Sequence, residues 1–105
     1  MKQLRAENET VEAEIRWLGL AEGGRKSLPT VREYRSIVRF EDDPNAVLGT
    51  WDVRVEFLDE PTLELPNPSR LGFVSADAPR QLLHSGSRFE LTEGRKVVAH
   101  GVVRP

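Results

Sequence analysis

The sequence predicts an all-β domain of about six short strands, folded as an antiparallel barrel or sandwich. Apolar and polar residues alternate with a period of two in most segments, as in strands that bury one face. Clusters of Gly, Pro, Asn and Asp separate these segments at short intervals. Helical character is confined to residues 79–83, where a proline precedes two leucines in a single turn.

The expected strands are residues 11–17, 34–40, 51–57, 71–74, 88–92 and 96–103. In the first of them, Val11, Ala13, Ile15 and Trp17 share one face. Aromatic residues occupy equivalent positions in the other strands, so we expect most of them in the core: Trp17, Phe40, Trp51, Phe57, Phe73 and Phe89. Residues 96–103 are apolar on both faces, which is typical of a strand that is covered on both sides or closes a barrel.

Turn-forming residues lie between these strands. They are Gly23-Gly24, Asp42-Asp43-Pro44-Asn45, Asp59-Glu60-Pro61, Pro66-Asn67-Pro68, Ser85-Gly86 and Glu93-Gly94. Asp42-Asp43-Pro44-Asn45 lacks the glycine and distal glutamate of a calcium loop, so it is interpreted as a solvated turn.

Length and composition indicate one globular domain. The chain has 105 residues, of which 38% are hydrophobic and 30% charged, so it is too apolar for a disordered protein and too charged for a membrane protein. We expect a flexible N-terminal arm at residues 1–10 and a single barrel domain at residues 11–105. The absence of cysteine excludes disulfides, thiolate catalysis and cysteine-based zinc sites. No apolar leader is present near Met1, and a cytoplasmic location is expected.

The net charge of −2 is unevenly distributed. Residues 16–39 carry six cations and two acids, and residues 41–64 carry eight acids and one cation. This polarity fits either a mixed solvated surface or a molecule with one basic face for phosphate.

Two segments resemble the C-terminal domain (domain 3) of the elongation factor Tu family. The first is Glu22-Gly23-Gly24-Arg25 followed by Tyr34-Arg35 and Phe40, and the second is Glu93-Gly94-Arg95 followed by Val97 to Val103. The similarity covers residues 11–40 and 86–103. It implies a six-stranded antiparallel Greek-key β-barrel.

The resemblance also implies a role in translation, where this domain helps to hold the T-stem of aminoacyl-tRNA. Ile37 stands where the family has a glutamine that contacts the RNA, and Asp42-Asp43 replaces a threonine-containing turn. A P-loop would need glycines where Leu20 and Arg25 stand, so we expect neither nucleotide binding nor GTPase activity.

Two glycine turns and one row of arginines are the candidate ligand-binding residues. Gly23, Gly24, Arg25 and Lys26 form either a phosphate cradle or a tight turn that needs positive φ. Gly94 and Arg95 fit a hairpin turn between two strands. Arg35 and Arg39 share a strand face, where they either bind an anion or pair across strands with Glu12, Glu14, Glu56 or Glu90.

No catalytic, metal or cofactor site is predicted. His84 and His100 do not form a local metal-binding motif, and His100 is interpreted as a half-buried, space-filling residue. The preferred hypothesis is a non-catalytic binding module for a protein partner, with a translation-associated protein as one such partner. An RNA-binding module that uses Arg25, Lys26, Arg35 and Arg39 is the alternative, and a small enzyme is the second alternative. A monomer or an edge-paired homodimer is expected, with no membrane partner.

Overall fold

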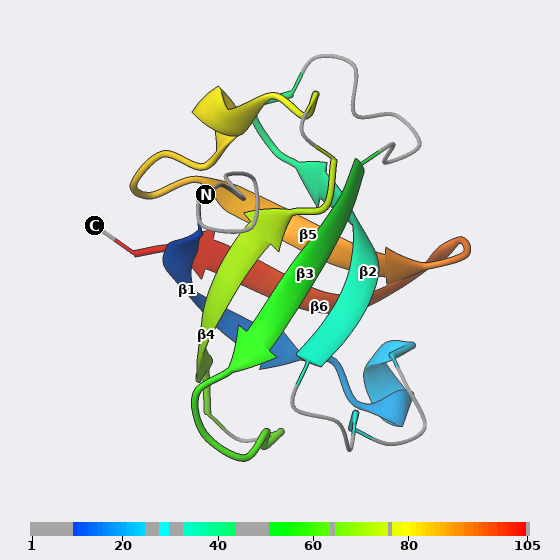
Figure 1. Ribbon diagram of the computed structural model, residues 1–105. Coiled ribbons are helices and arrows are strands. Elements are labelled where there is room, and N and C mark those ends of the chain that lie inside the picture. Colours follow the sequence, from blue (N-terminus) through cyan, green and yellow to red (C-terminus); the bar gives the residue numbers. More distant parts are fainter. Residues whose placement is uncertain are drawn as a thin grey trace.

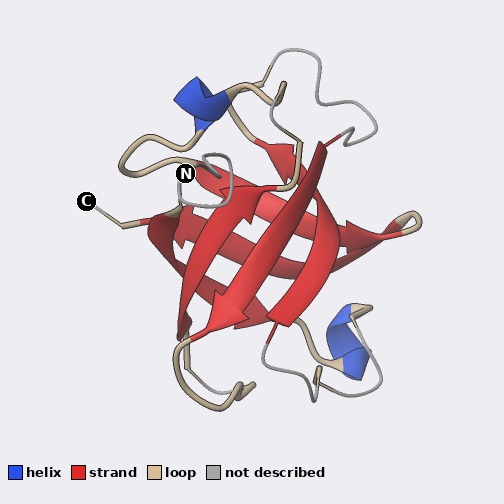
Figure 2. Ribbon diagram, in the orientation of Figure 1, coloured by secondary structure: helices blue, strands red, loops and turns tan. Residues whose placement is uncertain are grey.

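The computed structural model describes residues 10–24, 28–29, 33–43, 51–63, 65–75 and 77–104. Their six antiparallel strands form one closed barrel (Figures 1 and 2). The strands are β1 (Val11–Trp17), β2 (Glu33–Phe40), β3 (Trp51–Phe57), β4 (Asn67–Phe73), β5 (Arg88–Glu93) and β6 (Lys96–Val103). Closure confirms the barrel and excludes the sandwich. None of the six strands keeps a free edge, so they offer no place for an edge-paired homodimer.

The strand order around the barrel is β1-β4-β3-β2-β5-β6. Strands β2, β3 and β4 are consecutive neighbours, and β1 lies beside β4, which is the arrangement of a Greek key. Strands β5 and β6 form a hairpin that closes the barrel between β2 and β1. The connection from β1 to β2 contains a 3₁₀ turn at Leu20–Glu22 that the sequence pattern did not predict. The expected helical turn before β5 is present at Arg80–Leu82.

The alternating residues line the barrel as predicted. In β1 the buried positions are Ala13, Ile15 and Trp17, and in β3 they are Val53, Val55 and Phe57. Five of the six aromatic residues expected in the core are buried, while Trp51 is partly buried and packs edge-on against Phe73. Contacts between aromatic rings also join strands that are not neighbours in the sheet, for example Trp17 to Phe57 and Phe40 to Phe73.

Strand β4 begins four residues earlier than predicted. We expected a turn at Pro66-Asn67-Pro68 and a strand from residue 71, but the strand starts at Asn67 and includes Pro68. The backbone of this segment lies between β1 and β3, with Asn67 opposite Ile15 and Ser69 opposite Phe57. Pairing on both sides therefore outweighs the local preference of the two prolines for a turn.

Strand β6 carries a bulge that explains its apolar run. Leu91 of β5 lies opposite Ala99, whereas Thr92 lies opposite Val97, so Val98 is an additional residue. The bulge lets the consecutive residues Val98 and Ala99 both be buried. The next residue, His100, faces outward with a side chain that is 52% exposed, so it is about half-buried, as expected, and lies outside the core.

A glycine in β6 makes room for an aromatic ring of β5. Gly101 lies opposite Phe89 in the register of the hairpin. A Cβ atom on Gly101 would lie 2.2 Å from Cζ of Phe89, well inside van der Waals contact. The buried Phe89 ring therefore packs over Gly101, the one position where β6 has no side chain.

Candidate binding surface

At Gly23 the backbone has the positive φ that the tight-turn interpretation requires. Gly23 has φ of +85°, which glycine adopts without strain. Gly24 is buried, and a Cβ there would lie 2.0 Å from the Leu18 carbonyl oxygen. Two further candidates from this turn, Arg25 and Lys26, lie outside the described residues.

The turn already holds an anionic group of its own. The Gly19 N–H donates to the Glu22 carboxylate (N···O 3.1 Å), and Arg16 pairs with the same carboxylate at 3.2 Å. The N–H groups of Glu22 and Gly24 both donate to the Gly19 carbonyl. An external phosphate would find these amides occupied, so the geometry favours the interpretation as a structural turn.

The Glu22 carboxylate makes this turn sensitive to acid. Its hydrogen bond from the Gly19 N–H, and then that from Arg16, holds the pKa of Glu22 below its ordinary value of 4.5. A carboxyl with a lowered folded-state pKa stabilises the fold above its unfolded pKa and loses that contribution as pH falls through the folded value.

Glu22→Gln is therefore expected to melt at a lower temperature than the wild type at pH 7. The difference should shrink progressively below about pH 4.5, where the wild-type carboxylate itself becomes protonated. Thermal unfolding at pH 7, 4.5 and 3 measures this difference. Glu12→Gln is the matched control, because Glu12 has no ion-pair partner in the described part of the chain. An equal deficit at all three pH values would contradict the assignment.

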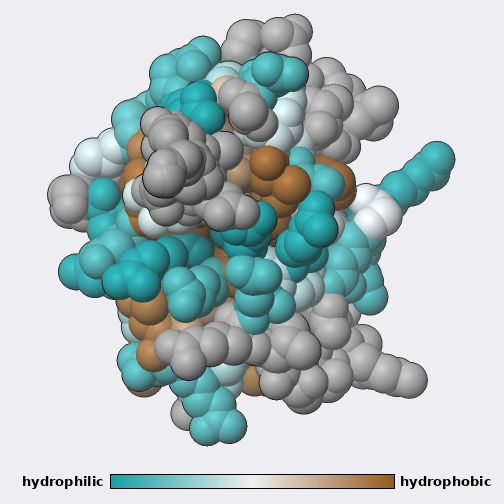
Figure 3. All heavy atoms as spheres, viewed as in Figure 1, coloured by the Kyte–Doolittle hydropathy of each residue, from teal (hydrophilic) through white to brown (hydrophobic). Residues whose placement is uncertain are grey.

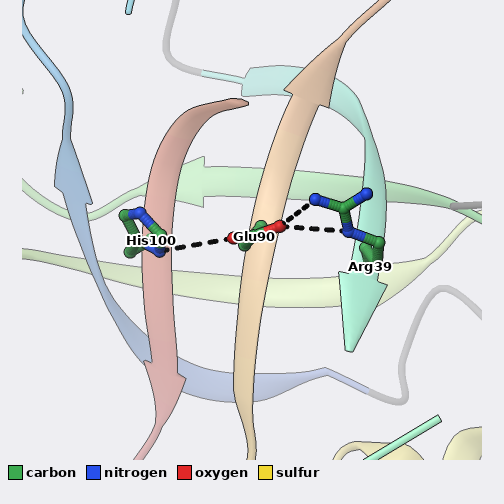
Figure 4. A network of polar contacts seen from close by, with 3 residues as sticks. All are labelled: Arg39, Glu90 and His100. Atoms are coloured by element: carbon green, nitrogen blue, oxygen red, sulfur yellow. Dashed lines mark hydrogen bonds and ion pairs between the residues drawn. The ribbon is translucent and has the colours of Figure 1, made fainter. Parts of the chain in front are cut away.

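The two candidate arginines of β2 lie on the outer face of the barrel, as their spacing predicted. Arg39 donates to the Glu90 carboxylate of β5 through Nε at 3.0 Å and also through Nη2. Glu90 also lies 4.0 Å from Nδ1 of His100 on β6, so one carboxylate faces cationic or titratable groups on both neighbouring strands (Figure 4). Cross-strand pairing with Glu90, one of the two interpretations of Arg39, is thus what the structure shows.

Arg35 is more weakly paired than Arg39. Its Nη2 lies 4.0 Å from Asp52, and both side chains are about half exposed. Arg54 lies directly opposite Arg35 on β3 and pairs with Glu33 at 3.6 Å. The outward positions of β2 are Glu33, Arg35, Ile37 and Arg39, so an apolar residue separates the two arginines and the basic row is interrupted.

The second glycine turn is a hairpin, as predicted. Gly94 has φ of +63°, and Glu93 lies opposite Lys96 in the backbone register of the β5–β6 hairpin. Arg95 and Lys96 are exposed at its tip and have no ion-pair partner among the described residues. Their guanidinium and ammonium groups are solvated cations that could meet an anionic partner.

His84 contacts one acceptor with each of its ring nitrogens. Nε2 of His84 lies 3.1 Å from the Asp42 carboxylate, and its Nδ1 lies 3.1 Å from the Ser85 carbonyl oxygen. Both ring nitrogens face acceptors, which leaves neither positioned as a base toward a nucleophile. No group of three His, Asp or Glu residues is arranged around a metal position among the described residues.

A shallow depression of about 110 Å³ lies over β2, β3 and β4. Its lining includes Thr10, Gly72, Phe73 and four charged residues, Glu33, Arg54, Glu56 and Arg70. The charged residues pair with one another, at 3.6 Å for Arg54 with Glu33 and 3.5 Å for Arg70 with Glu56. Each charged residue that lines the depression therefore already has a partner of opposite charge.

Sequence reasoning missed an apolar surface on the connection between β3 and β4. We call the described residues of this connection, 58–63 and 65–66, the leucine loop. Leu58, Leu63 and Leu65 are exposed to 37%, 49% and 65%, and they are the large hydrophobic residues exposed in the described part of the chain. The sequence pattern assigned residues 59–61 and 66–68 to turns and no role to the leucines. Three leucines in a turn-rich acidic stretch outside any alternating segment were the available signal.

Carboxylates accompany these leucines. Asp59 and Glu60 are exposed and have no ion-pair partner among the described residues. The leucine loop lies at the lower end of the barrel in Figure 1, and hydrophobic surface is visible near that end in the space-filling view (Figure 3). Three exposed leucines and two exposed carboxylates on one short connection make it a candidate protein-interaction site.

In comparisons with known proteins, no family model, no curated protein and no solved structure matches this chain. Among the described residues, no helix is both long enough and apolar enough to cross a membrane.

Proposed function

We propose that this chain is a non-catalytic binding module whose partner is another protein. The observation that carries the proposal is the exposure of Leu58, Leu63 and Leu65 on the leucine loop. Leaving these side chains in water forgoes stabilisation that burial would provide, about 1.5–3 kcal/mol for each one fully buried. A partner that covers them would recover part of this free energy.

The contacts at the other candidate sites support the same proposal, because their polar groups are already paired within the chain. The glycine turn near Glu22 is internally satisfied, and Arg39 is paired with Glu90. His84 has both ring nitrogens against acceptors. These contacts favour neither the anion-binding interpretation of Arg39 nor an enzyme built around His84.

We also propose that the barrel is related to the C-terminal domain of elongation factor Tu. The segments that carry the resemblance include β1, β2, β5 and β6, together with both glycine turns. The Greek-key order of a closed six-stranded barrel is the topology that the resemblance implies. A translation-associated protein is therefore the partner class to examine first.

Leu63→Ser/Leu65→Ser is expected to abolish capture of the protein partner. The purified chain, immobilised at micromolar concentration, would be exposed to a lysate of its source organism, and retained proteins would be compared by mass spectrometry. Arg95→Ser/Lys96→Ser is the matched control, since it changes two exposed residues on the hairpin tip. The proposal requires a protein that the wild type and the control retain and the leucine variant loses. Retention of nothing specific would contradict it.

The wild type and the same variants also test the RNA-binding alternative. This alternative is favoured by the exposed side chains of Arg95 and Lys96, which have no ion-pair partner among the described residues. Phosphate-driven binding would retain tRNA at low salt, weaken steeply as salt rises and weaken further in Arg95→Ser/Lys96→Ser. A gel-shift titration of tRNA at several salt concentrations distinguishes this alternative from the protein-binding proposal.

A further inference from the structure

We infer that the leucine loop is a preformed docking surface for a basic amphipathic helix of the partner protein. The inference rests on the proposed function and specifies its surface and the chemistry of its partner. Three observations carry it: the internal hydrogen bonding of the loop, the closure of the sheet, and the carboxylates beside the leucines.

The backbone of the leucine loop is held from within by one buried side chain. Asn67 accepts a hydrogen bond from the Thr62 N–H at 2.7 Å. Its Nδ2 donates to the carbonyls of Ile15 (2.9 Å), Thr62 (3.0 Å) and Leu65 (3.3 Å). This network ties the loop to β1. A loop backbone that is held in place before binding loses less conformational entropy when a partner covers the loop.

The way in which a partner can bind depends on which backbone groups of this surface are free to form hydrogen bonds with it. Strand addition requires a free sheet edge, and none of the six strands has one. Within the loop, the Leu58 N–H donates to the Pro68 carbonyl, and the Leu65 N–H donates to Thr62 Oγ1. The loop therefore presents leucine side chains, and a partner must offer an apolar face. A helix supplies such a face through residues three and four apart.

The charge of the partner follows from the acids beside the leucines. Asp59 and Glu60 are exposed and unpaired in the described part of the chain. Across an interface, complementary charges speed association and reject partners of the same sign. Lysine or arginine at the flanks of the apolar face would meet these carboxylates, whereas a helix with acidic flanks would be repelled.

A displayed library of random 16-residue peptides tests this inference even while the partner is unidentified. Selection on the wild-type chain should enrich sequences with apolar residues at helical spacing flanked by lysine or arginine. Enriched peptides should lose at least tenfold in affinity for Leu63→Ser/Leu65→Ser and severalfold for Asp59→Asn/Glu60→Gln. They should bind Gln81→Ser, an exposed exchange on the 3₁₀ turn Arg80–Leu82 that leaves the net charge unchanged, like the wild type. All the exchanged side chains are exposed, so the variants should remain folded.

The outcomes separate the inference from the proposed function. Enriched peptides without cations, or peptides that bind the leucine variant as tightly as the wild type, would overturn the inference. The same holds if no peptide is enriched. In each of these cases, loss of a lysate partner in the leucine variant would still support protein binding. Retention of nothing from the lysate would contradict the proposed function itself.

Discussion

Replacing Asn67 by leucine is expected to lower the free energy of unfolding by about 3 kcal/mol, because the hydrogen bonds of its buried side-chain amide would be lost, including the fully buried one to the Ile15 carbonyl. Asn67 is buried and satisfies the carbonyls of Ile15, Thr62 and Leu65 as well as the Thr62 N–H. Leucine is similar in size but makes none of these bonds. Urea unfolding followed by tryptophan fluorescence measures the change.

Ser69→Ala is the matched control for Asn67→Leu. Ser69 is also buried on β4, but its hydroxyl makes only one hydrogen bond among the described residues, to the Asn67 carbonyl at 3.1 Å. We expect a loss of about 1 kcal/mol for this single bond. Hydrogen exchange should also speed up in residues 58–66 of Asn67→Leu beyond the change in β3. Equal losses in the two variants would show that Asn67 does not hold the leucine loop.

Gly101→Val should destabilise the barrel by roughly 3 kcal/mol, the upper part of the range for overpacking a core. A side chain at this position meets the Phe89 ring, which is itself buried. Phe89→Ala alone is expected to cost about 3–5 kcal/mol through the cavity that it leaves. Valine at position 101 would occupy part of that cavity in the double variant.

The double variant therefore tests the contact itself. Phe89→Ala/Gly101→Val should be more stable than the sum of the single changes predicts, by at least about 1 kcal/mol. Gly86→Ala is the control, because Gly86 has φ of +84° and open space around its Cβ direction. It should cost only about 1 kcal/mol for the backbone conformation. Strict additivity of Phe89→Ala and Gly101→Val would contradict this packing.

The exposed leucines and the buried asparagine belong to one arrangement. Asn67 fixes the backbone that carries Leu63 and Leu65, while Asp59 and Glu60 lie on the same connection. A change that destabilises the loop should weaken partner binding even when the leucines are intact. Among the candidates chosen from sequence, Arg39 pairs with Glu90, and the turn at Gly23 is held by hydrogen bonds of its own residues.

Much of the barrel was predictable from local chemistry. Strand pleating sends successive side chains to opposite faces, so the alternation in β1 and β3 identified their buried residues directly. Gly23 and Gly94 were recognised as turn glycines because positive φ strains other residues. The early start of β4 at Asn67 was missed, since the local sequence favours a turn and the pairing that overrides it comes from distant strands.

The candidate site was less predictable for the same reason. Residues an even number of positions apart on a strand share a face, so the sequence placed Arg35 and Arg39 on one outer face. That pattern does not show whether an arginine has an ion-pair partner on a neighbouring strand. The choice for Arg39 depended on Glu90, far away in the sequence, lying opposite it on β5. The leucine loop lies outside the strands, where no periodicity indicates whether an apolar side chain is covered.

The amino-acid sequence by itself determined the period-two burial pattern, the turn glycines and the all-β class, because these depend on neighbouring residues along one chain. Tertiary structure alone decided the strand order, the bulge at Val98, the partner of Arg39 and the exposure of the three leucines. Each of these depends on which segments become neighbours when the sheet closes, and side chains far apart in sequence meet only then.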